Sequence, residues 1–164
     1  MDHLWTPWRY RYVTSDADAA AKRKECVFCR ILGSDSGDRE NLIVHRADHN
    51  FVILNRFPYA SGHTMVIPYA HLATLAEAPA ETLREMMALT QKLEGALRSL
   101  YAPDGVNIGM NIGRAAGAGV AGHIHMHAVP RWIADTNFAT VIAETRVLPE
   151  ELDVTWERLS AAFL

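Results

Sequence analysis

The sequence predicts an α+β domain built on an antiparallel sheet. Three short segments rich in Val, Ile, Leu and Phe come first, a long segment with helical periodicity follows, and two more strand-like segments come after it. Strands grouped in this way pair with their sequence neighbours, whereas parallel sheets alternate strands with helices. The 164 residues, 49% of them hydrophobic, fit one domain with a single core.

The start of the chain differs in composition from the rest. A polar stretch at 15–21 follows a group of aromatic and basic side chains, namely Trp5, Trp8, Arg9, Tyr10, Arg11 and Tyr12. Because disordered segments are poor in aromatic residues, we interpret residues 1–22 as an ordered arm packed over a main domain of residues 23–164. A mobile terminus is the alternative.

A loop rich in Gly, Ser and Asp at 33–41 precedes the first strands. Residues 41–46 and 51–56 are rich in β-branched and aromatic side chains, and the polar turn Ala-Asp-His-Asn separates them, which predicts a hairpin. A second loop at 58–62 leads to a third strand at 63–67, which a proline ends.

A long helix is predicted from Pro79 onward. Along one face, residues recur at three- and four-residue steps, as expected for a core-facing stripe: Leu83, Met86, Met87, Thr90, Leu93, Leu97 and Leu100. Strands at 106–111 and 123–129 follow. A short terminal helix at 148–163, with Pro149 near its start, completes the domain.

Charge and hydropathy narrow the classes of partner. The formal net charge of −3 gives no reason to expect a basic track for nucleic acid. No segment approaches the roughly 18 uninterrupted apolar residues of a membrane span, and residues 1–12 lack the apolar stretch of a secretory signal. We therefore expect a cytoplasmic protein without nucleic-acid or membrane partners, for which a small nucleotide remains possible as a ligand.

Three alternating histidines are the most informative residues. Side chains of a strand point to opposite faces in turn, so His123, His125 and His127 are predicted to share one face, about 6.6 Å apart at two steps of roughly 3.3 Å. Such a row can address one phosphate or one metal ion. A histidine-rich surface strand and a catalytic zinc site with an open water position are the alternatives.

A glycine-rich stretch at 109–122 precedes the histidines. It contains a formal G-x-G-x-x-G at Gly117, Gly119 and Gly122, but the dinucleotide fingerprint requires a helix after it, and here a strand follows. No lysine follows the last glycine, so it is not a Walker A loop either. Its glycines can still bring backbone N–H groups close to phosphate oxygens.

Cys26 and Cys29 are the two cysteines of the chain. Their two-residue gap lets both thiolates reach one tetrahedral ion, but a structural zinc site needs two further ligands. A redox-active pair and two unliganded thiols are the alternatives; a thioredoxin-like motif would require a βαβ context, which the sequence lacks.

The pattern at 123–129, His-φ-His-φ-His-φ-φ, resembles the signature of the histidine triad superfamily. Nearly the whole chain shares the resemblance, and it is most similar to the bacterial diadenosine tetraphosphate phosphorylase-like group. The other motifs that carry it are Leu4–Arg9, Asn55–Pro58, Gly62–Pro68, Asn111–Gly113, Pro130–Trp132 and Asp135–Phe138. The resemblance implies a histidine triad fold with an N-terminal zinc knuckle.

The resemblance also implies catalytic roles. His125 attacks the α-phosphorus of a nucleotide through one ring nitrogen, while the other nitrogen donates to a backbone carbonyl. His127 holds a phosphate oxygen and assists the leaving group. The positions that contact phosphate are Asn111, Ala118 and Gly119. Some relatives carry Ser, Thr or Gln around 119–120 and this chain does not, which leaves water or inorganic phosphate open as the acceptor.

Three further positions match the nucleotide site of the family. Asn55 corresponds to the residue that binds the ribose hydroxyls, Ile53 can line the base pocket, and His63 is adjacent to the active site. For Asn55 the alternative is a turn residue at a strand end, and for His63 a hydrogen-bonded core imidazole.

By the same resemblance, His71 and His123 complete a structural zinc site with Cys26 and Cys29. A Mg²⁺ or Mn²⁺ ion bound with the nucleotide and a homodimeric assembly are further implications of the family.

The sequence thus predicts a nucleotide hydrolase or nucleotidyltransferase that cleaves dinucleoside polyphosphates by hydrolysis or phosphorolysis. Cleavage of the P–N bond in nucleoside phosphoramidates would use the same residues and is the first alternative. A purine-nucleotide-binding or sensing protein is the second.

Overall fold

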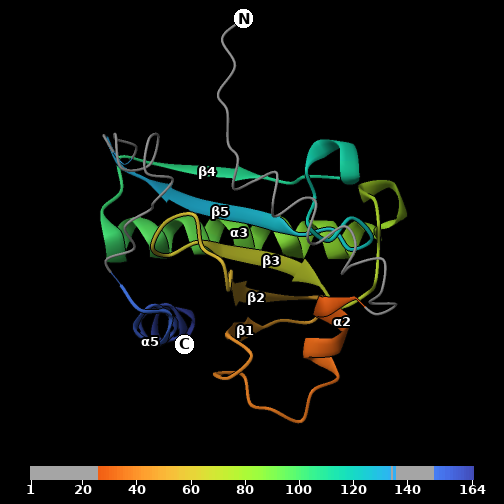
Figure 1. Cartoon of the computed structure of the whole chain (residues 1–164), viewed down its shortest axis with the longest axis horizontal. Helices are drawn as coiled ribbons and strands as arrows, with labels where there is room; N and C mark the ends of the chain where they lie inside the picture. Colours follow the sequence, from red (N-terminus) through yellow and green to blue (C-terminus); the bar gives the residue numbers. More distant parts are fainter. Residues whose placement is uncertain (1–25, 134, 136–149) are drawn as a thin grey trace, which may run out of the picture.

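The computed structural model describes residues 26–133, 135 and 150–164. Within them a five-stranded antiparallel sheet has the order β1-β2-β3-β5-β4 (Figure 1). The predicted α+β class with an antiparallel sheet is confirmed. The elements are α2 (Val27–Leu32), β1 (Ile43–Arg46), β2 (Asn50–Leu54), β3 (Thr64–Pro68), the 3-10 helix η1 (Leu75–Glu77), α3 (Ala80–Tyr101), β4 (Gly105–Gly109), the 3-10 helix η2 (Arg114–Ala116), β5 (Met126–Arg131) and α5 (Leu152–Phe163).

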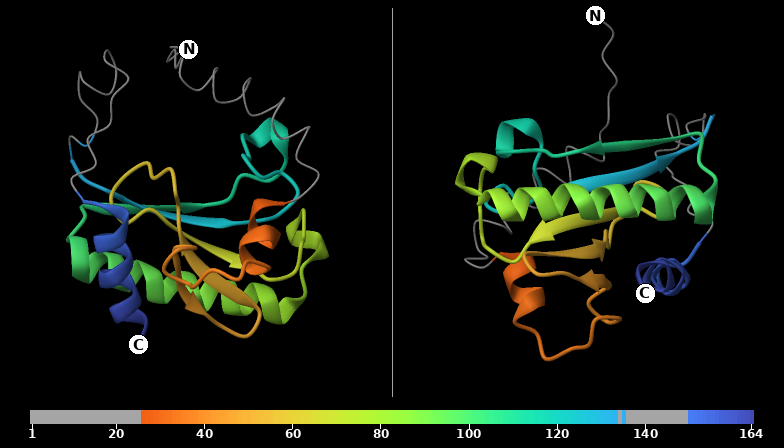
Figure 2. Two further views of the ribbon diagram at one scale, coloured as in Figure 1. Left: turned by 60° about the horizontal axis from the view of Figure 1, so that its bottom comes forward. Right: turned by 180° about the vertical axis from the view of Figure 1, so that it is seen from behind.

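The register divides the central strands into two faces. Ile53 of β2 pairs with Met65 of β3, which pairs with His127 of β5, so these three side chains share one face. Helix α3 covers the opposite face (Figure 2, right). Gly62, just before β3, lies close to this helix, because a Cβ added at Gly62 would be 3.0 Å from the Leu97 side chain of α3.

One stripe of α3 enters the core. Its buried residues follow the helical period, and they are Thr82, Met86, Leu89, Thr90, Leu93, Ala96 and Leu97. Of the predicted stripe, four residues are buried: Met86, Thr90, Leu93 and Leu97. Leu83 and Leu100 are half-buried. Met87 is 58% exposed, because it lies one step to the solvent side of Met86.

Glu85 of α3 holds the turn of the β1–β2 hairpin. Its carboxylate accepts hydrogen bonds from the amides of Asp48 and His49, at 3.0 and 2.8 Å, and from the side chain of Asn50 at 2.7 Å. Asn50 is fully buried. The predicted hairpin is therefore fixed to the long helix as well as to its own turn.

Helix α5 packs against both α3 and β1. Glu150 accepts hydrogen bonds from Tyr101 and Arg158, which joins the start of α5 to the end of α3. Trp156 donates its indole N–H to the carbonyl of Ile43 at 2.8 Å. Burial and the bond to Glu150 raise the pKa of Tyr101 to about 12.

Some boundaries differ from prediction. Helix α2 was not predicted, because its six residues are too few for a periodic pattern. The third strand includes its proline, and α5 begins at Leu152. The arm predicted at 1–22 and the start of the terminal helix at 148–149 lie outside the described residues. In the segments that the structure describes, no helix combines the length and apolar character needed to cross a bilayer.

Candidate active site and metal centre

His125 and His127 lie together at the start of β5. His125 is 5% exposed, and its ring centroid is 4.9 Å from that of His127. Nδ1 of His125 lies 2.8 Å from the carbonyl oxygen of His123. Because a carbonyl oxygen only accepts, Nδ1 carries the hydrogen, and Nε2 of the neutral ring keeps its lone pair. His125 can therefore act as a nucleophile through Nε2.

The strand predicted at 123–129 begins three residues later, at Met126. The amide of Ile124 donates to the carbonyl of Leu72 at 2.8 Å, outside the β3–β5 ladder, so the chain enters β5 from a turn. The ring of His123 lies against Phe28 of α2, which also contacts the ring of His125.

A series of hydrogen bonds fixes the hydrogen on His127. The amide of Tyr59 donates to Nδ1 of His63 at 3.1 Å, so Nε2 of the neutral His63 ring carries the hydrogen. This Nε2 lies 2.9 Å from Nδ1 of His127, which accepts it. His127 therefore has an N–H at Nε2, whereas His125 has a lone pair there. His63 is 1% exposed, so it is both a buried, hydrogen-bonded imidazole and a neighbour of the site.

Burial lowers the pKa of both histidines. For His125 burial outweighs the opposing effect of the hydrogen bond to the His123 carbonyl, and the pKa falls below its ordinary value of 6.5. For His127 burial, together with the neighbouring His125, lowers the pKa to about 4. Both rings are therefore neutral at pH 7, the state that a nucleophile requires.

Ile53 and Asn55 lie on the same sheet face as His63. Ile53 is 3% exposed. The backbone amide of Asn55 donates to the backbone carbonyl of His63 at 3.0 Å. The side-chain oxygen of Asn55 accepts from the amide of Phe57 at 3.0 Å. Asn55 thus closes the turn after β2, and its Nδ2 atom lies 3.4 Å from both ring nitrogens of His63.

Asn111 follows the end of β4. Gly109, the last residue of β4, pairs with His127 of β5. Asn111 comes two residues later, beyond the paired residues, and is half-buried.

The loop from β4 to β5 carries Ala118 and Gly119. Gly113 and Gly117 adopt positive φ values of 80° and 86° on either side of η2, conformations that favour glycine. The amide of Ala118 donates to the carbonyl of Gly113 at 3.3 Å. This amide is engaged within the loop, so it would have to change partner to reach a phosphate.

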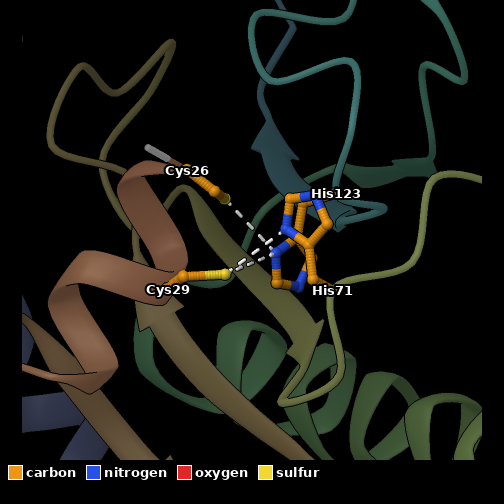
Figure 3. Close-up of side chains that lie close together, drawn as sticks. All are labelled: Cys26, Cys29, His71 and His123. Carbon is orange, nitrogen blue, oxygen red and sulfur yellow. Dashed lines mark hydrogen bonds between the residues drawn. The ribbon is translucent and has the colours of Figure 1, made fainter. Parts of the chain in front are cut away.

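Cys26, Cys29, His71 and His123 form a compact cluster between α2 and the sheet (Figure 3). All four ligand atoms lie within 4.8 Å of one another. Nδ1 of His123 is 3.4 Å from Sγ of Cys26, and Nδ1 of His71 is 3.3 Å from Sγ of Cys29. Zn–S and Zn–N bonds of about 2.3 and 2.1 Å at tetrahedral angles separate sulfur and nitrogen by roughly 3.6 Å. The cluster therefore fits a tetrahedral metal ion.

The second nitrogen of His123 supports this fit. Nε2 lies 2.9 Å from the carbonyl oxygen of Pro68, so it carries the hydrogen and leaves Nδ1 unprotonated. Metal-binding histidines usually donate their other N–H in this way. Two cysteines and two histidines leave no open position on a tetrahedral ion, so the cluster has the composition of a structural site.

Sequence reasoning missed three participants. The carbonyl of Pro68 and the amide of Tyr59 are backbone groups, which no side-chain pattern reveals. Phe28 lies in the gap between Cys26 and Cys29, and its ring contacts those of His123 and His125. An aromatic residue inside a C-x-x-C gap was the available signal.

Comparison with known proteins decides the family. The HIT domain matches residues 36–132, which include the predicted nucleotide-site residues. The chain belongs to the HIT family. The AP-4-A phosphorylase of Mycobacterium tuberculosis is 36% identical to it over 157 residues, 93% of this chain and 79% of that protein.

Solved HIT structures agree with the fold. A Zn-bound histidine triad family protein from Mycobacterium smegmatis is 32% identical, with a TM-score of 0.65 over 84% of this chain and 92% of that one. A hypothetical histidine triad nucleotide-binding protein from Sulfolobus tokodaii is 27% identical, with a TM-score of 0.67 over 84% and 91%. HIT proteins are nucleotide hydrolases or transferases, and this chain is an enzyme of that class.

Proposed function

We propose that the chain cleaves dinucleoside polyphosphates such as diadenosine tetraphosphate through a nucleotidyl-histidine at His125. The observation that carries the proposal is the 2.8 Å contact between Nδ1 of His125 and the carbonyl of His123. It leaves a lone pair on Nε2 of a buried, neutral ring. A hydrogen-bonded imidazole of this kind is an activated nucleophile near neutral pH.

In the first step, the Nε2 lone pair of His125 forms a bond to the α-phosphorus. The P–O bond to the polyphosphate breaks, and the leaving oxygen takes the electron pair. The polyphosphate leaves as its anion, and the N–H at Nε2 of His127 donates a hydrogen bond to the leaving oxygen, since Nδ1 of His127 accepts from His63. Asn111 and the amides of Ala118 and Gly119 bind the phosphate oxygens, and Asn55 and Ile53 hold the ribose and base.

In the second step, water or inorganic phosphate attacks the nucleotidyl-histidine. The P–N bond breaks, its electron pair returns to Nε2 of His125, and the proton of the acceptor passes to solvent. The name of the Mycobacterium tuberculosis relative, AP-4-A phosphorylase, favours phosphate as the acceptor.

The test is to incubate the pure protein with diadenosine tetraphosphate, with and without phosphate, and to identify the products. ADP plus ATP formed only with phosphate indicates a phosphorylase, whereas AMP plus ATP without it indicates a hydrolase. His125→Ala should abolish turnover and leave the fold and metal content intact. Normal turnover in that variant, or release of AMP from a phosphoramidate with no polyphosphate cleavage, contradicts the proposal.

We propose that the ion of the four-residue cluster is zinc. Cys26, Cys29, His71 and His123 would hold it, and the Zn-bound relative supports this choice. When bound, zinc supplies a structural cross-link and no open coordination position. Metal analysis should give one zinc per chain, and Cys26→Ala should lower both metal content and melting temperature.

Three smaller points of the proposal follow the family. We place the enzyme in the cytoplasm as a homodimer, and we allow for a Mg²⁺ or Mn²⁺ ion bound with the nucleotide. Light scattering after gel filtration tests the dimer, and assays with chelator followed by each divalent ion test the metal requirement.

A further inference from the structure

Phe28 joins the metal cluster to the nucleophile. It lies on α2 between Cys26 and Cys29 and is 6% exposed. Its ring meets that of His123 edge-on with centroids 5.4 Å apart, and it meets that of His125 in a tilted contact at the same distance. One side chain therefore touches both a candidate metal ligand and the candidate nucleophile.

A second connection runs through the backbone of His123. The ring of His123 is held on both sides, by Cys26 at 3.4 Å from Nδ1 and by the carbonyl of Pro68 at 2.9 Å from Nε2. The carbonyl of the same residue accepts from Nδ1 of His125. The atom that fixes the hydrogen on the nucleophile thus belongs to a residue whose side chain lies in the metal cluster.

Helix α2 has little stability of its own. It has six residues and no side-chain N-cap, and isolated helices of this length do not persist in water. Its position against the sheet therefore depends on tertiary contacts: the packing of Phe28, Val27, Ile31 and Leu32 against the core and whatever Cys26 and Cys29 bind. Binding of an ion by the two cysteines on either side of Phe28 would restrain its ring.

We propose that the metal-loaded cluster orients the ring of His125 for attack, acting through the ring of Phe28 and the carbonyl of His123. This inference rests on the proposed function, in which His125 is the nucleophile. Phe28 is a positioning residue, because it acts on the reaction through His125. Attack requires an aligned lone pair, and a displacement of about 1 Å can lower a rate by about a hundredfold.

The first test compares two buried phenylalanines. Phe28→Leu and Phe163→Leu remove the same ring, and Phe163 is equally buried, at 5% exposed, but packs against His45 in another part of the fold. With diadenosine tetraphosphate as substrate and zinc content measured in parallel, Phe28→Leu should keep its zinc and its KM and lose about tenfold in kcat. Phe163→Leu should keep kcat.

Two outcomes of this comparison would overturn the inference. One is a kcat in Phe28→Leu no lower than in Phe163→Leu. The other is a raised KM with unchanged kcat, which would place Phe28 in substrate binding instead.

The second test needs no turnover. Long-range ¹H–¹⁵N spectra report which nitrogen of each histidine carries the hydrogen. With Zn²⁺ bound, His125 should show the single tautomer with the hydrogen on Nδ1. After chelation, or in zinc-loaded Phe28→Leu, the ring should exchange between its two tautomers, so that the chemical shifts of its two nitrogens approach each other. His127 should not change, because His63 fixes it from the other side.

A single, unchanged His125 tautomer in both the chelated protein and zinc-loaded Phe28→Leu would refute the inference. The spectra also separate this inference from the proposed function. If the protein cleaves no polyphosphate, the proposed function fails, but the effect of the metal on the His125 tautomer can still be measured.

Discussion

Replacement of His63 by leucine tests the hydrogen-bond series that ends at His127. His63 accepts from the amide of Tyr59 at 3.1 Å and donates to Nδ1 of His127 at 2.9 Å. Leucine has a similar volume and neither function. Nδ1 of His127 then has no donor from this position, and the hydrogen is free to move from Nε2 to Nδ1.

The size of the effect follows from the bond that is lost. A net hydrogen bond of about 1–1.5 kcal/mol selects the donor form of His127, and each 1.36 kcal/mol corresponds to a factor of about ten in rate. We therefore expect kcat to fall about five- to tenfold in His63→Leu, with KM little changed. Removal of His127 itself should cost about 10²–10³, the usual effect of losing one hydrogen-bond donor to a developing oxyanion.

The assay is the initial rate of diadenosine tetraphosphate cleavage, with unfolding in urea measured on the same samples. His63→Gln is the matched control, because its side-chain amide can donate to His127 and should restore most of the rate. A His63→Leu enzyme with the full kcat, or a His63→Gln enzyme no faster than His63→Leu, would show that His63 does not set the state of His127.

Three further predictions concern pH and stability. The pKa of His127 is about 4 in the fold and about 6.5 in the unfolded chain, so between these pH values the unfolded chain binds more protons. The melting temperature should therefore stay constant above pH 6.5 and fall as the pH drops toward 4. In His127→Gln this fall should be less steep. Glu85→Ala, which removes the acceptor of three hydrogen bonds, should cost about 1–3 kcal/mol in urea unfolding, whereas exposed Gln91→Ala on the same helix should change little. Gly62→Ala should destabilise the protein by about 1–3 kcal/mol, since φ is +79° and the new Cβ would lie 3.0 Å from the Leu97 side chain of α3. Gly95→Ala, with open space around it, should stabilise the protein by roughly 0.4–1 kcal/mol. Equal effects at the two glycines would contradict this reasoning.

The fold class could be predicted because it depends on periodicity. The run of β-branched and other apolar residues at 51–54 and the three- and four-residue steps along α3 are properties of consecutive residues, and the five strands, α3 and α5 lie within a few residues of their predicted ranges. The four members of the metal cluster were named from the family resemblance and lie together in the structure. Local sequence alone provided only the two cysteines of that set.

The details of the site could not be predicted in the same way. Alternation predicted a strand from His123, but β5 begins at Met126, and the amide of Ile124 bonds instead to the carbonyl of Leu72; such a tertiary contact leaves no local pattern. The hydrogen positions on His63 and His127 depend on a backbone amide. Burial, which lowers the pKa of His125 and His127, is a property of the assembled fold.

The bond from Trp156 to the carbonyl of Ile43 offers an optical reporter of how the last helix docks. The indole is half-buried where α5 meets the edge strand β1. If α5 leaves the sheet, this ring passes into water, and its fluorescence should shift to longer wavelength. A variant that keeps Trp156 as its sole tryptophan would therefore distinguish detachment of the final helix from global melting, without any substrate or metal in the cuvette.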